Sequence, residues 1–386
     1  MTRVAVLAYT EIARDSRVIR TCDALAEAGF EVTAVGFGAR VSPAWGFVAL
    51  PQMGSLRAQR LALLGTQAPA NLVPALAPRL HFLRAHHRAA RAALIALKPD
   101  VIHANDWTAL PAAVATARAT GARVVYDSHE FAAEEHADNL RWRLVAQASA
   151  RATEARLIGA AAATITVSDG IADALQRAHR LPARPAVVRN APGFEDVALS
   201  DAAWPRRLLF HGVLKPGRGV ESAIAATAAL PDHVLTLRGD GGADYLAFLR
   251  EKAQAAGGRV RFEPAVAPGD VVRAAAASQI GLFCAPLDTG HNRFAMPNKF
   301  FEYAMAGLAT LAARGSELGA LVERLGCGAL ADDASPQALA DTLRGIDDAD
   351  LARMRAAGLA AARAMCWDRE KQVLIGVYSD AVTRRR

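Results

Sequence analysis

The chain has 386 residues, which is more than one hydrophobic core usually holds, so two domains are predicted. With 52% hydrophobic and 22% charged residues, the composition is that of a globular protein and argues against disorder. The net charge is only +7 and no aromatic-basic stripe is present, which disfavours nucleic-acid binding. This charge could favour binding of an anionic substrate or of an anionic membrane surface. It also fits an Arg-rich surface that is simply solvated.

The N-terminal stretch "MTRVAVLAYTE" predicts a strand rather than a signal peptide, and no apolar run is long enough to span a membrane. The four cysteines lie far apart and lack metal-ligand spacing, so no metal site is expected. They suit a reduced, cytoplasmic setting, with the inner face of the membrane as an alternative location.

The first half of the chain alternates apolar strands with helices. "RVAVLAY" predicts a strand, "SRVIRTCDALAEAG" an amphipathic helix ended by Gly29, and "FEVTAVGF" the next strand. Three later strands, each followed by helical sequence, are "PDVIHAND", "ARVVYDSHE" and "ATITVSD". This order predicts a parallel sheet covered on both faces.

Segment 52–98 contains two further predicted helices, "LRAQRLALLG" and "LHFLRAHHRAARAALIAL". Helices that cover the sheet are one interpretation, and amphipathic helices on a membrane surface are the other.

Residues 190–205, rich in Pro, Gly and acidic side chains, predict a linker and a hinge. After it the alternation restarts, with strands predicted in "RRLLFHG", "HVLTLRGDG", "RVRFEP", "IGLFCAP" and "ATLAAR". A last helix, from near Asp368, is expected to cross back to the first domain. The predicted domains are therefore 1–192 and 200–365, with a returning helix over 366–386.

Three loops of the second half follow strands and open helices: 211–221, 238–242 and 287–302. Open α/β sheets bind ligands at this edge. Glycines permit close approach of the backbone, helix N–H groups favour an anion, and Lys215 and Arg218 add positive charge.

The stretch "FAMPNKFFEYAMAG", residues 294–307, predicts a buried helix with Pro297 in its first turn. Lys299 near its N-terminus could hold a phosphate, and Glu302, one turn on, could accept hydrogen bonds from a ribose diol. The alternative is an ordinary ion pair between these two side chains.

At this point the sequence resembles a family. "PNKFFEYAMAGLATLAA" is similar to the donor-site helix of retaining glycosyltransferases of family 4, which have the GT-B fold. "GVLKPGRGVE", "LRGDG" and "RFEP" stand in the expected order before it. "DSRVIRTCDALAEAGFEVTAV", "DVIHANDWTALPAA", "VVYDSHEF" and "TITVSDGIADAL" resemble the N-terminal domain of that family, so the resemblance covers essentially the whole chain.

The resemblance implies two Rossmann-like parallel-sheet domains facing across a cleft that closes on binding. It implies transfer of a hexose, with retention of configuration, from a nucleotide diphosphate sugar to a hydroxyl, as in polysaccharide biosynthesis. UDP-sugar is the first expectation for the donor and GDP-sugar the second. The acceptor is a glycan, a lipid carrier or a small molecule. No cofactor and no metal are expected.

The resemblance also assigns residues. Glu302 would bind the ribose, Lys299 and Arg218 the diphosphate, and His129 would lie near the sugar and the acceptor; these four form the expected catalytic set. Further donor contacts are expected at Gly212, Lys215, Gly239, Gly241, Glu263, Pro264, Asn292, Arg293, Phe294, Ala295, Met296 and Asn298. Acceptor contacts are expected at Arg17, Asp106 and Glu130.

Two positions depart from the family pattern. Phe294 stands where many members have a sugar-binding Glu, and Asn292 is expected to substitute. Val213 follows Gly212 where many have an Arg, so Lys215 is expected to supply part of that charge. These departures favour an alternative function, a non-catalytic nucleotide-sugar or glycan binder with the same fold. An NAD-dependent oxidoreductase is disfavoured, because the first strand is not followed by G-x-G-x-x-G.

Several N-terminal residues have structural alternatives. His129 could be a satisfied histidine at a strand end, Glu130 could cap the next helix, and Arg17 could pair with Asp15 instead of meeting an acceptor. His103 and Asp106 could suggest a metal, but without a third ligand a loop that shapes the acceptor side is preferred. Asp169 is interpreted as a helix cap.

Overall fold

The computed structural model describes residues 1–52, 54, 56–132, 134, 139–201 and 203–383, with the backbone alone at 56–60 and 63. The chain forms two compact units. The N-terminal unit comprises Met1–Arg189 and Glu370–Arg386, and the C-terminal unit comprises Asn190–Arg369. The chain therefore passes from one unit to the other at 189/190 and returns at 369/370.

The N-terminal unit is built on a seven-stranded sheet with strand order β3-β2-β1-β4-β5-β6-β7. Every pair in it is parallel, which confirms the predicted class of sheet. β3 and β7 were not predicted, because they are too short to show an apolar pattern. The strands are β1 (Arg3–Glu11), β2 (Glu31–Phe37), β3 (Gly46–Ala49), β4 (Val101–Asn105), β5 (Arg123–Ser128), β6 (Ala163–Thr166) and β7 (Ala186–Val187).

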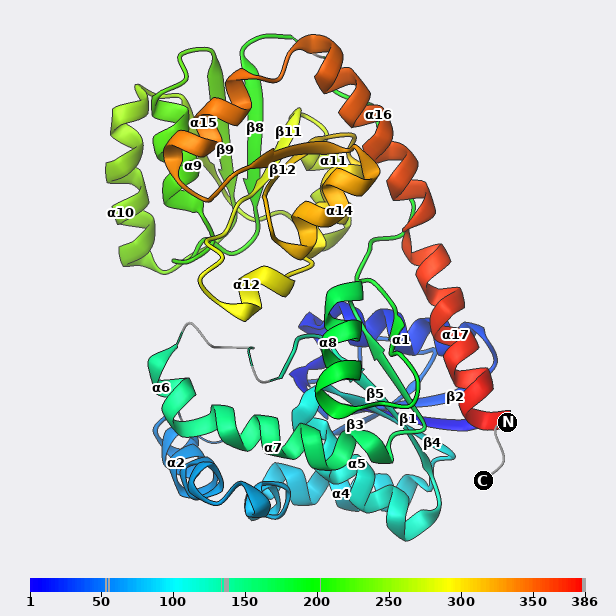
Figure 1. The fold of residues 1–386 in the computed structure, drawn as a ribbon. Helices are drawn as coiled ribbons and strands as arrows, with labels where there is room; N and C mark the ends of the chain where they lie inside the picture. Colours follow the sequence, from blue (N-terminus) through cyan, green and yellow to red (C-terminus); the bar gives the residue numbers. More distant parts are fainter. Residues whose placement is uncertain (53, 55, 133, 135–138, 202, 384–386) are drawn as a thin grey trace. The chain divides into compact units, whose positions relative to one another are not determined.

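Helices cover both faces of this sheet, with α4, α5 and α7 on one face and α1 and α8 on the other (Figure 1). α1 begins where the Asp15 side chain accepts a hydrogen bond from Val18 N and ends before Gly29, as predicted. The helices are α1 (Ser16–Glu27), α2 (Leu56–Leu72), α3 (Ala77–Leu80), α4 (Ala85–Leu97), α5 (Asp106–Thr120), α6 (Leu140–Trp142), α7 (Ala148–Leu157) and α8 (Asp169–His179).

The prediction of one helix across "LHFLRAHHRAARAALIAL" is wrong. Arg84 has an extended backbone, with φ −86° and ψ 137°, and it separates α4 from the short turns before it. Of the helices in the described residues, none is long and apolar enough to traverse a bilayer.

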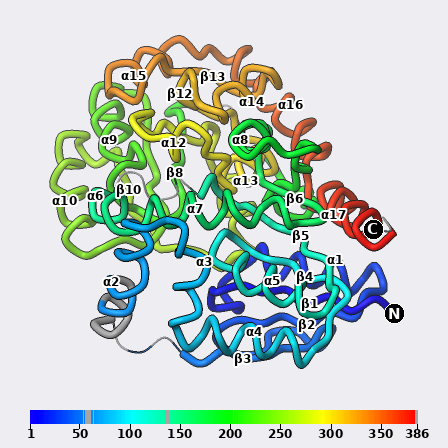
Figure 2. Tube along the Cα trace, turned by 60° about the horizontal axis from the view of Figure 1, so that its bottom comes forward, coloured from blue at the N-terminus to red at the C-terminus, as the bar shows by residue number. Residues whose placement is uncertain are grey.

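α17 (Trp367–Thr383) begins in the C-terminal unit and continues in the N-terminal unit. α17 is the red helix in Figure 1 and Figure 2, and it lies beside α1 in both views. The Tyr378 ring meets Phe30 with centroids 5.9 Å apart, and Lys371 Nζ lies 3.3 Å from Glu27 Oε2. The last helix thus completes the N-terminal unit.

The C-terminal unit has a six-stranded parallel sheet with order β10-β9-β8-β11-β12-β13. Along β8, Leu208 and Phe210 pack with α9 and α15, whereas Leu209 packs with α11 and α13 on the other face. The strands are β8 (Arg206–His211), β9 (His233–Arg238), β10 (Val260–Glu263), β11 (Ile280–Phe283), β12 (Ala309–Ala313) and β13 (Gly328–Ala331). The helices are α9 (Val220–Ala228), α10 (Ala243–Ala253), α11 (Val271–Ala275), α12 (Gly290–Phe294), α13 (Asn298–Met305), α14 (Glu317–Leu325), α15 (Pro336–Arg344) and α16 (Asp348–Ala364).

The stretch 294–307 differs from its prediction at its start. Phe294 ends α12, and α13 begins only at Asn298. Pro297 is therefore the residue before the helix, with an extended backbone (φ −72°, ψ 139°), and not a member of its first turn. A proline also biases the residue before it toward extended conformations, which favours the break.

Candidate functional site

Two glycine loops of the C-terminal unit pack directly against each other beyond β8 and β9. Gly239 has φ +149°, and a Cβ on it would lie 2.0 Å from the carbonyl oxygen of Gly212. A Cβ on Gly241 would lie 2.5 Å from the carbonyl oxygen of Leu214, and Leu214 and Gly241 form a β-bridge. Glycine is thus required at both positions by the close approach of the two loop backbones.

The Lys299 side chain, in the first turn of α13, points to the loop after β8. Its Nζ lies 3.8 Å from the centroid of the Phe210 ring, and a Cβ on Gly212 would be 3.5 Å from it. Burial, aided by the positive charge of Arg218, lowers the pKa of Lys299 to about 7, against an opposing effect of Glu302. An anion at this ammonium would stabilise its charged form.

Arg218 and Lys215 belong to the same loop, between β8 and α9. Within the described parts of the chain, neither of them nor Lys299 has a carboxylate at ion-pair distance. α9 starts at Val220 with no side chain capping its N-terminus, and a Cβ on Gly219 would lie 2.1 Å from the carbonyl oxygen of Cys284. Unpaired cations and uncapped N–H groups give this loop a positive potential suited to an anion.

Glu302 lies next to His211, not in an ion pair with Lys299. His211 Nε2 and Glu302 Oε2 are 2.7 Å apart, although they are not aligned for a hydrogen bond. The Tyr303 hydroxyl accepts from His211 N at 3.3 Å and so fixes the backbone there. The simple ion-pair interpretation of Lys299 and Glu302 is therefore wrong. The sequence analysis missed His211; its signal was a titratable residue ending an apolar strand before a glycine.

Glu263, at the end of β10, is held by two contacts. Its carboxylate pairs with Arg238 (Nη2 to Oε2, 2.6 Å), and its carbonyl oxygen accepts from Gly239 N at 3.0 Å. The following Pro264 is exposed. The Glu263 carboxylate therefore links β10 to β9. A nucleotide base could contact Glu263 only through the atoms that these two contacts leave free.

The segment from Asn292 to Asn298 is organised by hydrogen bonds to the loop after β11. Asn292 Nδ2 donates to the carbonyl oxygen of Pro286 at 2.8 Å, and Arg293 Nε donates to that of Leu287 at 2.9 Å. Asn292 is buried, which shows that its amide nitrogen serves loop structure. Phe294, Ala295 and Met296 are half-buried, and Asn298 is exposed.

In the N-terminal unit, the carboxylate of Asp127 is a fully buried centre of polar contacts. Arg17 donates to both of its oxygens at 2.8 Å and to the carbonyl oxygen of Val188 at 2.8 Å. Burial alone would raise the pKa of Asp127, but Arg17 and His129 lower it well below its usual range. Arg17 therefore pairs with Asp127, not with Asp15, and its side chain is buried in this pair.

His129 lies between two carboxylates. Its Nε2 is 3.1 Å from Asp127 Oδ2, and its Nδ1 is 3.5 Å from Asp106 Oδ2. Burial by itself lowers the pKa of His129, but Asp106 and Asp127 outweigh it and raise the value to about 9. His129 is thus an imidazolium at neutral pH, with both nitrogens facing carboxylates. Asp106 opens α5 with φ +60°, a conformation rare for a residue with a side chain.

His103 also contacts Asp127, from β4. Its Nε2 lies 3.3 Å from Asp127 Oδ2, with imperfect alignment, and its Nδ1 lies 2.5 Å from the Tyr378 hydroxyl. No group of three metal-ligating side chains occurs among the residues described. Tyr378 was missed because nothing in the sequence relates it to a strand 275 residues away. Asp127 lies in the predicted strand "ARVVYDSHE", but the sequence did not predict a role for it.

Two capping predictions are wrong. Among the residues that the structure describes, the next helix after Glu130 is α6, and its cap is Asn139, whose side chain accepts from Trp142 N. Ser168, not Asp169, caps α8, since its hydroxyl accepts from Ile171 N. Asp169 instead pairs with Arg184 and Arg189.

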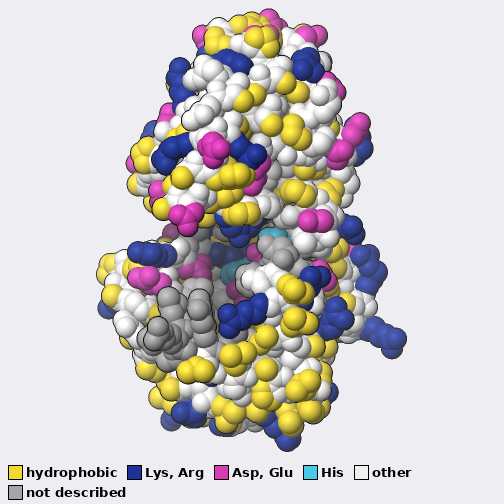
Figure 3. All heavy atoms as spheres, turned by 90° about the vertical axis from the view of Figure 1, so that its left-hand side faces the viewer, with side chains coloured by type: hydrophobic (Ala, Val, Ile, Leu, Met, Phe, Trp, Pro, Cys, Tyr) yellow, Lys and Arg dark blue, Asp and Glu magenta, His cyan; other side chains and the backbone are white. Residues whose placement is uncertain are grey.

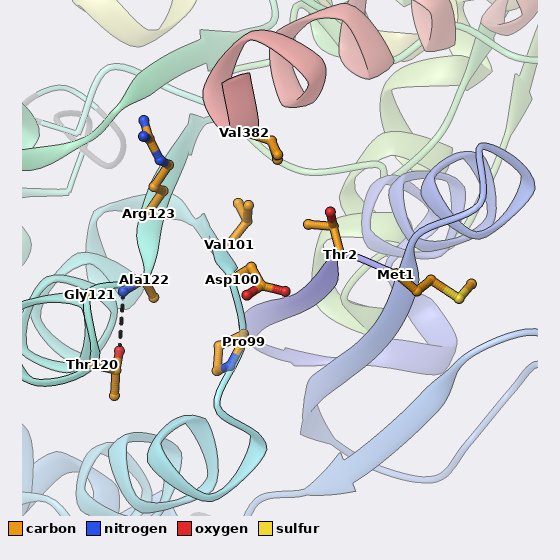
Figure 4. A pocket seen from close by; sticks show the side chains of 10 residues that line it. All are labelled: Met1, Thr2, Pro99, Asp100, Val101, Thr120, Gly121, Ala122, Arg123 and Val382. Atoms are coloured by element: carbon orange, nitrogen blue, oxygen red, sulfur yellow. Dashed lines mark hydrogen bonds between the residues drawn. The ribbon is translucent and has the colours of Figure 1, made fainter. Parts of the chain in front are cut away.

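A pocket of about 520 Å³ lies at the opposite edge of the N-terminal sheet, where β1, β4 and β5 begin (Figure 4). Its lining includes Thr2, Asp100, Arg123 and Val382. Parallel α/β sheets bind ligands at the carboxyl ends of their strands, so this pocket is not part of the candidate site.

Residues 16–191 match the family model described as Glycosyltransferase Family 4. No curated protein matches the chain. Similar solved structures include sucrose-phosphate synthase from Thermosynechococcus elongatus, with TM-score 0.77, 16% identity and 98% of each chain covered. Anabaena HepE in complex with UDP-glucose has TM-score 0.71 and 16% identity over 98% of this chain and 100% of that one. Trehalose 6-phosphate synthase from Burkholderia multivorans has TM-score 0.68 and 15% identity over 100% and 99%.

At these identities the structural likeness speaks for the fold. The chain has the two-domain GT-B fold, and its residues 16–191 carry the sequence pattern of Glycosyltransferase Family 4.

Proposed function

We propose that this protein is a retaining glycosyltransferase that transfers a hexose from a nucleotide diphosphate sugar to a hydroxyl. The C-terminal unit would bind the donor, and the N-terminal unit would bind the acceptor, which is a glycan, a lipid-linked sugar or a small molecule. The proposal is supported by the family match over residues 16–191 and by the glycosyltransferases among the similar structures.

The observation that carries the proposal is the group of cations beyond β8. Lys299 is held against Phe210 and beside Gly212, and burial together with the cation Arg218 lowers its pKa to about 7. Among the described residues it forms no ion pair with a carboxylate. Such an arrangement is unfavourable in the empty protein and becomes favourable when a diphosphate binds. The absence of a side chain on Gly212, on which a Cβ would lie 3.5 Å from Lys299 Nζ, leaves room for that diphosphate beside the ammonium.

Catalysis would rest on electrostatic stabilisation of the departing nucleoside diphosphate. Lys299 and Arg218 would offset its developing charge, and the uncapped N-terminus of α9 would add the partial charge of its N–H groups. Neither a metal nor a cofactor is needed for that role. Glu302, held beside His211, would accept hydrogen bonds from the ribose hydroxyls.

His129 would contribute as a hydrogen-bond donor and not as a base, because it holds its proton at neutral pH. The acceptor proton would then pass to the leaving phosphate. For the donor we propose UDP-sugar, with GDP-sugar as the alternative; the similar Anabaena structures are complexes with UDP-glucose and with UDP.

The test measures sugar transfer, donor hydrolysis and nucleotide affinity for the wild type, Lys299→Met and Glu302→Gln. Lys252→Met is the matched control, since Lys252 also lies over an aromatic ring, Phe248, but outside the candidate site. We expect both site variants to bind UDP at least about tenfold more weakly, which is about 1.4 kcal/mol, and to lose most transfer. Unchanged affinity and turnover in both would remove the donor site from this location.

A non-catalytic nucleotide-sugar or glycan binder is the second candidate. It is favoured by Val213, which is 66% exposed where many members of the resembled family have an Arg, and by Phe294, where many have a Glu. If the wild type binds one nucleoside diphosphate tightly yet neither transfers nor hydrolyses any donor from a broad panel, this second function replaces the first.

We also propose contact of the N-terminal unit with an anionic membrane at the cytoplasmic face. Residues 32–99 contain eight of the 45 Lys and Arg residues and no Asp or Glu, so the remainder of the chain is nearly neutral. Leu72, at the end of α2, and Leu144 are 85% and 68% exposed. They lie close together, because Asn71 Nδ2 donates to the carbonyl oxygen of Leu144 at 2.7 Å.

Leu61 in α2, Leu140 in α6 and Leu83 in the short turn before α4 are also exposed. The face shown in Figure 3 carries hydrophobic and basic side chains side by side on the N-terminal unit. Apolar and cationic groups together suit a bilayer with acidic headgroups. We expect co-sedimentation with vesicles of phosphatidylcholine and phosphatidylglycerol, weaker with phosphatidylcholine alone, and reduced in Leu72→Gln/Leu144→Gln. Equal sedimentation of the wild type and this variant would contradict the contact.

A further inference from the structure

A continuous series of buried polar contacts connects helix α17 with His129. Tyr378, on α17, meets His103 Nδ1 at 2.5 Å, and His103 Nε2 lies 3.3 Å from Asp127 Oδ2. The same Asp127 oxygen lies 3.1 Å from His129 Nε2. Tyr378, His103 and Asp127 are fully buried, so water does not compete for these contacts.

The direction of the hydrogen bonds follows from the chemistry of the two ends. Asp127 is ionised and can only accept. Burial raises the pKa of Tyr378 well above its ordinary value, so its hydroxyl keeps its proton. When His103 Nδ1 accepts from the Tyr378 hydroxyl, the ring hydrogen is on Nε2, the nitrogen that faces Asp127. The Tyr378 hydroxyl therefore selects the His103 tautomer that supports Asp127.

We propose that Tyr378 and His103 are positioning residues that act through Asp127 to hold the His129 ring in its observed orientation. Helix α17, which brings the chain back from the C-terminal unit, thereby takes part in setting the charge at this strand-end group. The positioning of the His129 ring does not depend on the proposed function. Only the effect of His129 on a substrate rests on that function.

The charge balance around His129 supports this role. The groups that face it are Asp127 from β5, Asp106 at the start of α5, and Arg17 from α1. His103 and Tyr378 reach it only through Asp127. Two carboxylates and two cations compensate one another, so a lost donor to Asp127 leaves more of its negative charge directed at His129.

The experiment follows the His129 imidazole by NMR in histidine-labelled protein, with His129→Gln used to identify its signal. Tyr378→Phe removes one hydroxyl, and His103→Leu removes both contacts of that ring. His103→Gln is the conservative variant, because its amide can donate to Asp127 and accept from Tyr378. Tyr126→Phe is the matched control: it also deletes a fully buried hydroxyl of this unit, one that donates to Glu154.

We expect the His129 titration midpoint to rise by about 0.5 pH unit in His103→Leu and by a smaller amount in Tyr378→Phe. His103→Gln and Tyr126→Phe should stay at the wild-type midpoint. If Tyr378→Phe and Tyr126→Phe titrate alike, or if His103→Gln shifts as far as His103→Leu, the proposal is overturned. Should His103→Leu fail to fold, the comparison of the two Tyr→Phe variants decides.

This readout needs no substrate. A protein without transferase activity would refute the proposed function and still give a valid titration, so the two failures are distinguishable. If transfer is present, Tyr378→Phe should also shift the alkaline limb of its pH profile to higher pH, while Tyr126→Phe should not.

Discussion

The two units place opposite charge arrangements at the carboxyl ends of their strands. In the C-terminal unit, Lys299 and Arg218 lie near each other with no carboxylate at ion-pair distance among the described residues. In the N-terminal unit, Arg17 and His129 are matched by Asp127 and Asp106.

This difference separates two uses of buried charge. A buried cation without a carboxylate partner is partly deprotonated near neutral pH, as the lowered pKa of Lys299 indicates. A bound anion would restore its charge. Matched cations and carboxylates hold one another in place, and removing one member leaves a buried charge without compensation. The first arrangement is typical of a ligand site and the second of a rigid support.

The strongest test of the matched group is Arg17→Met. It leaves the fully buried Asp127 without its bidentate partner, and we expect a loss of about 3–5 kcal/mol in the free energy of unfolding. Urea denaturation followed by circular dichroism measures it. Arg184→Met is the control, because Arg184 bonds two carboxylates at an exposed site and should cost at most about 1 kcal/mol. Equal losses would contradict the distinction drawn here.

A second prediction concerns acid, and it contrasts His129 with another group of histidines in the same unit. Burial, together with neighbouring positive groups, lowers the pKa of His81 to about 3 and that of His87 to about 2. Below about pH 6.5 these two histidines bind a proton in the unfolded chain but stay neutral in the folded chain. The free energy of unfolding therefore decreases as the pH falls.

We expect about 2 kcal/mol of lost stability per buried imidazole at pH 5, measured by urea denaturation across the pH range. His129 has the opposite sign. Its raised pKa stabilises the fold below about pH 6.5, and that contribution disappears as the pH rises through about 9. In His87→Phe, the fall in stability between pH 7 and pH 5 should be smaller; a fall as steep as that of the wild type would exclude His87 as a cause.

The smallest expected effect tests the unmatched cations. If UDP binds beside Lys299, its phosphates should restore the ordinary pKa of that ammonium. At pH 7.5 binding should then take up about 0.8 proton, since a group with a pKa of about 7 is mostly neutral there. Calorimetry in buffers of different ionisation enthalpy measures the uptake. Lys299→Met should abolish it, and an unchanged uptake in that variant would place the proton elsewhere.

Much of the fold was predictable because its signals are local. Apolar runs of strand length alternating with amphipathic helices indicated two parallel sheets, and both were found. The glycine loops were predictable as strand-to-helix turns. The packing of Gly239 against the carbonyl oxygen of Gly212 was not, because it joins two loops that are separate in the sequence. β7 has only two residues, and the helix is interrupted at the single residue Arg84. Both features are too short to change the periodicity of the sequence.

The sequence by itself determined which strands end in polar loops and which helix begins with Lys299, because periodicity and turn chemistry act over a few residues. Only the tertiary structure decided the partners: Arg17 with Asp127, Glu302 with His211, and His103 with Tyr378. Buried charges and hydrogen-bonding groups must be satisfied by whatever the folded chain brings beside them, and that choice spans up to 275 residues.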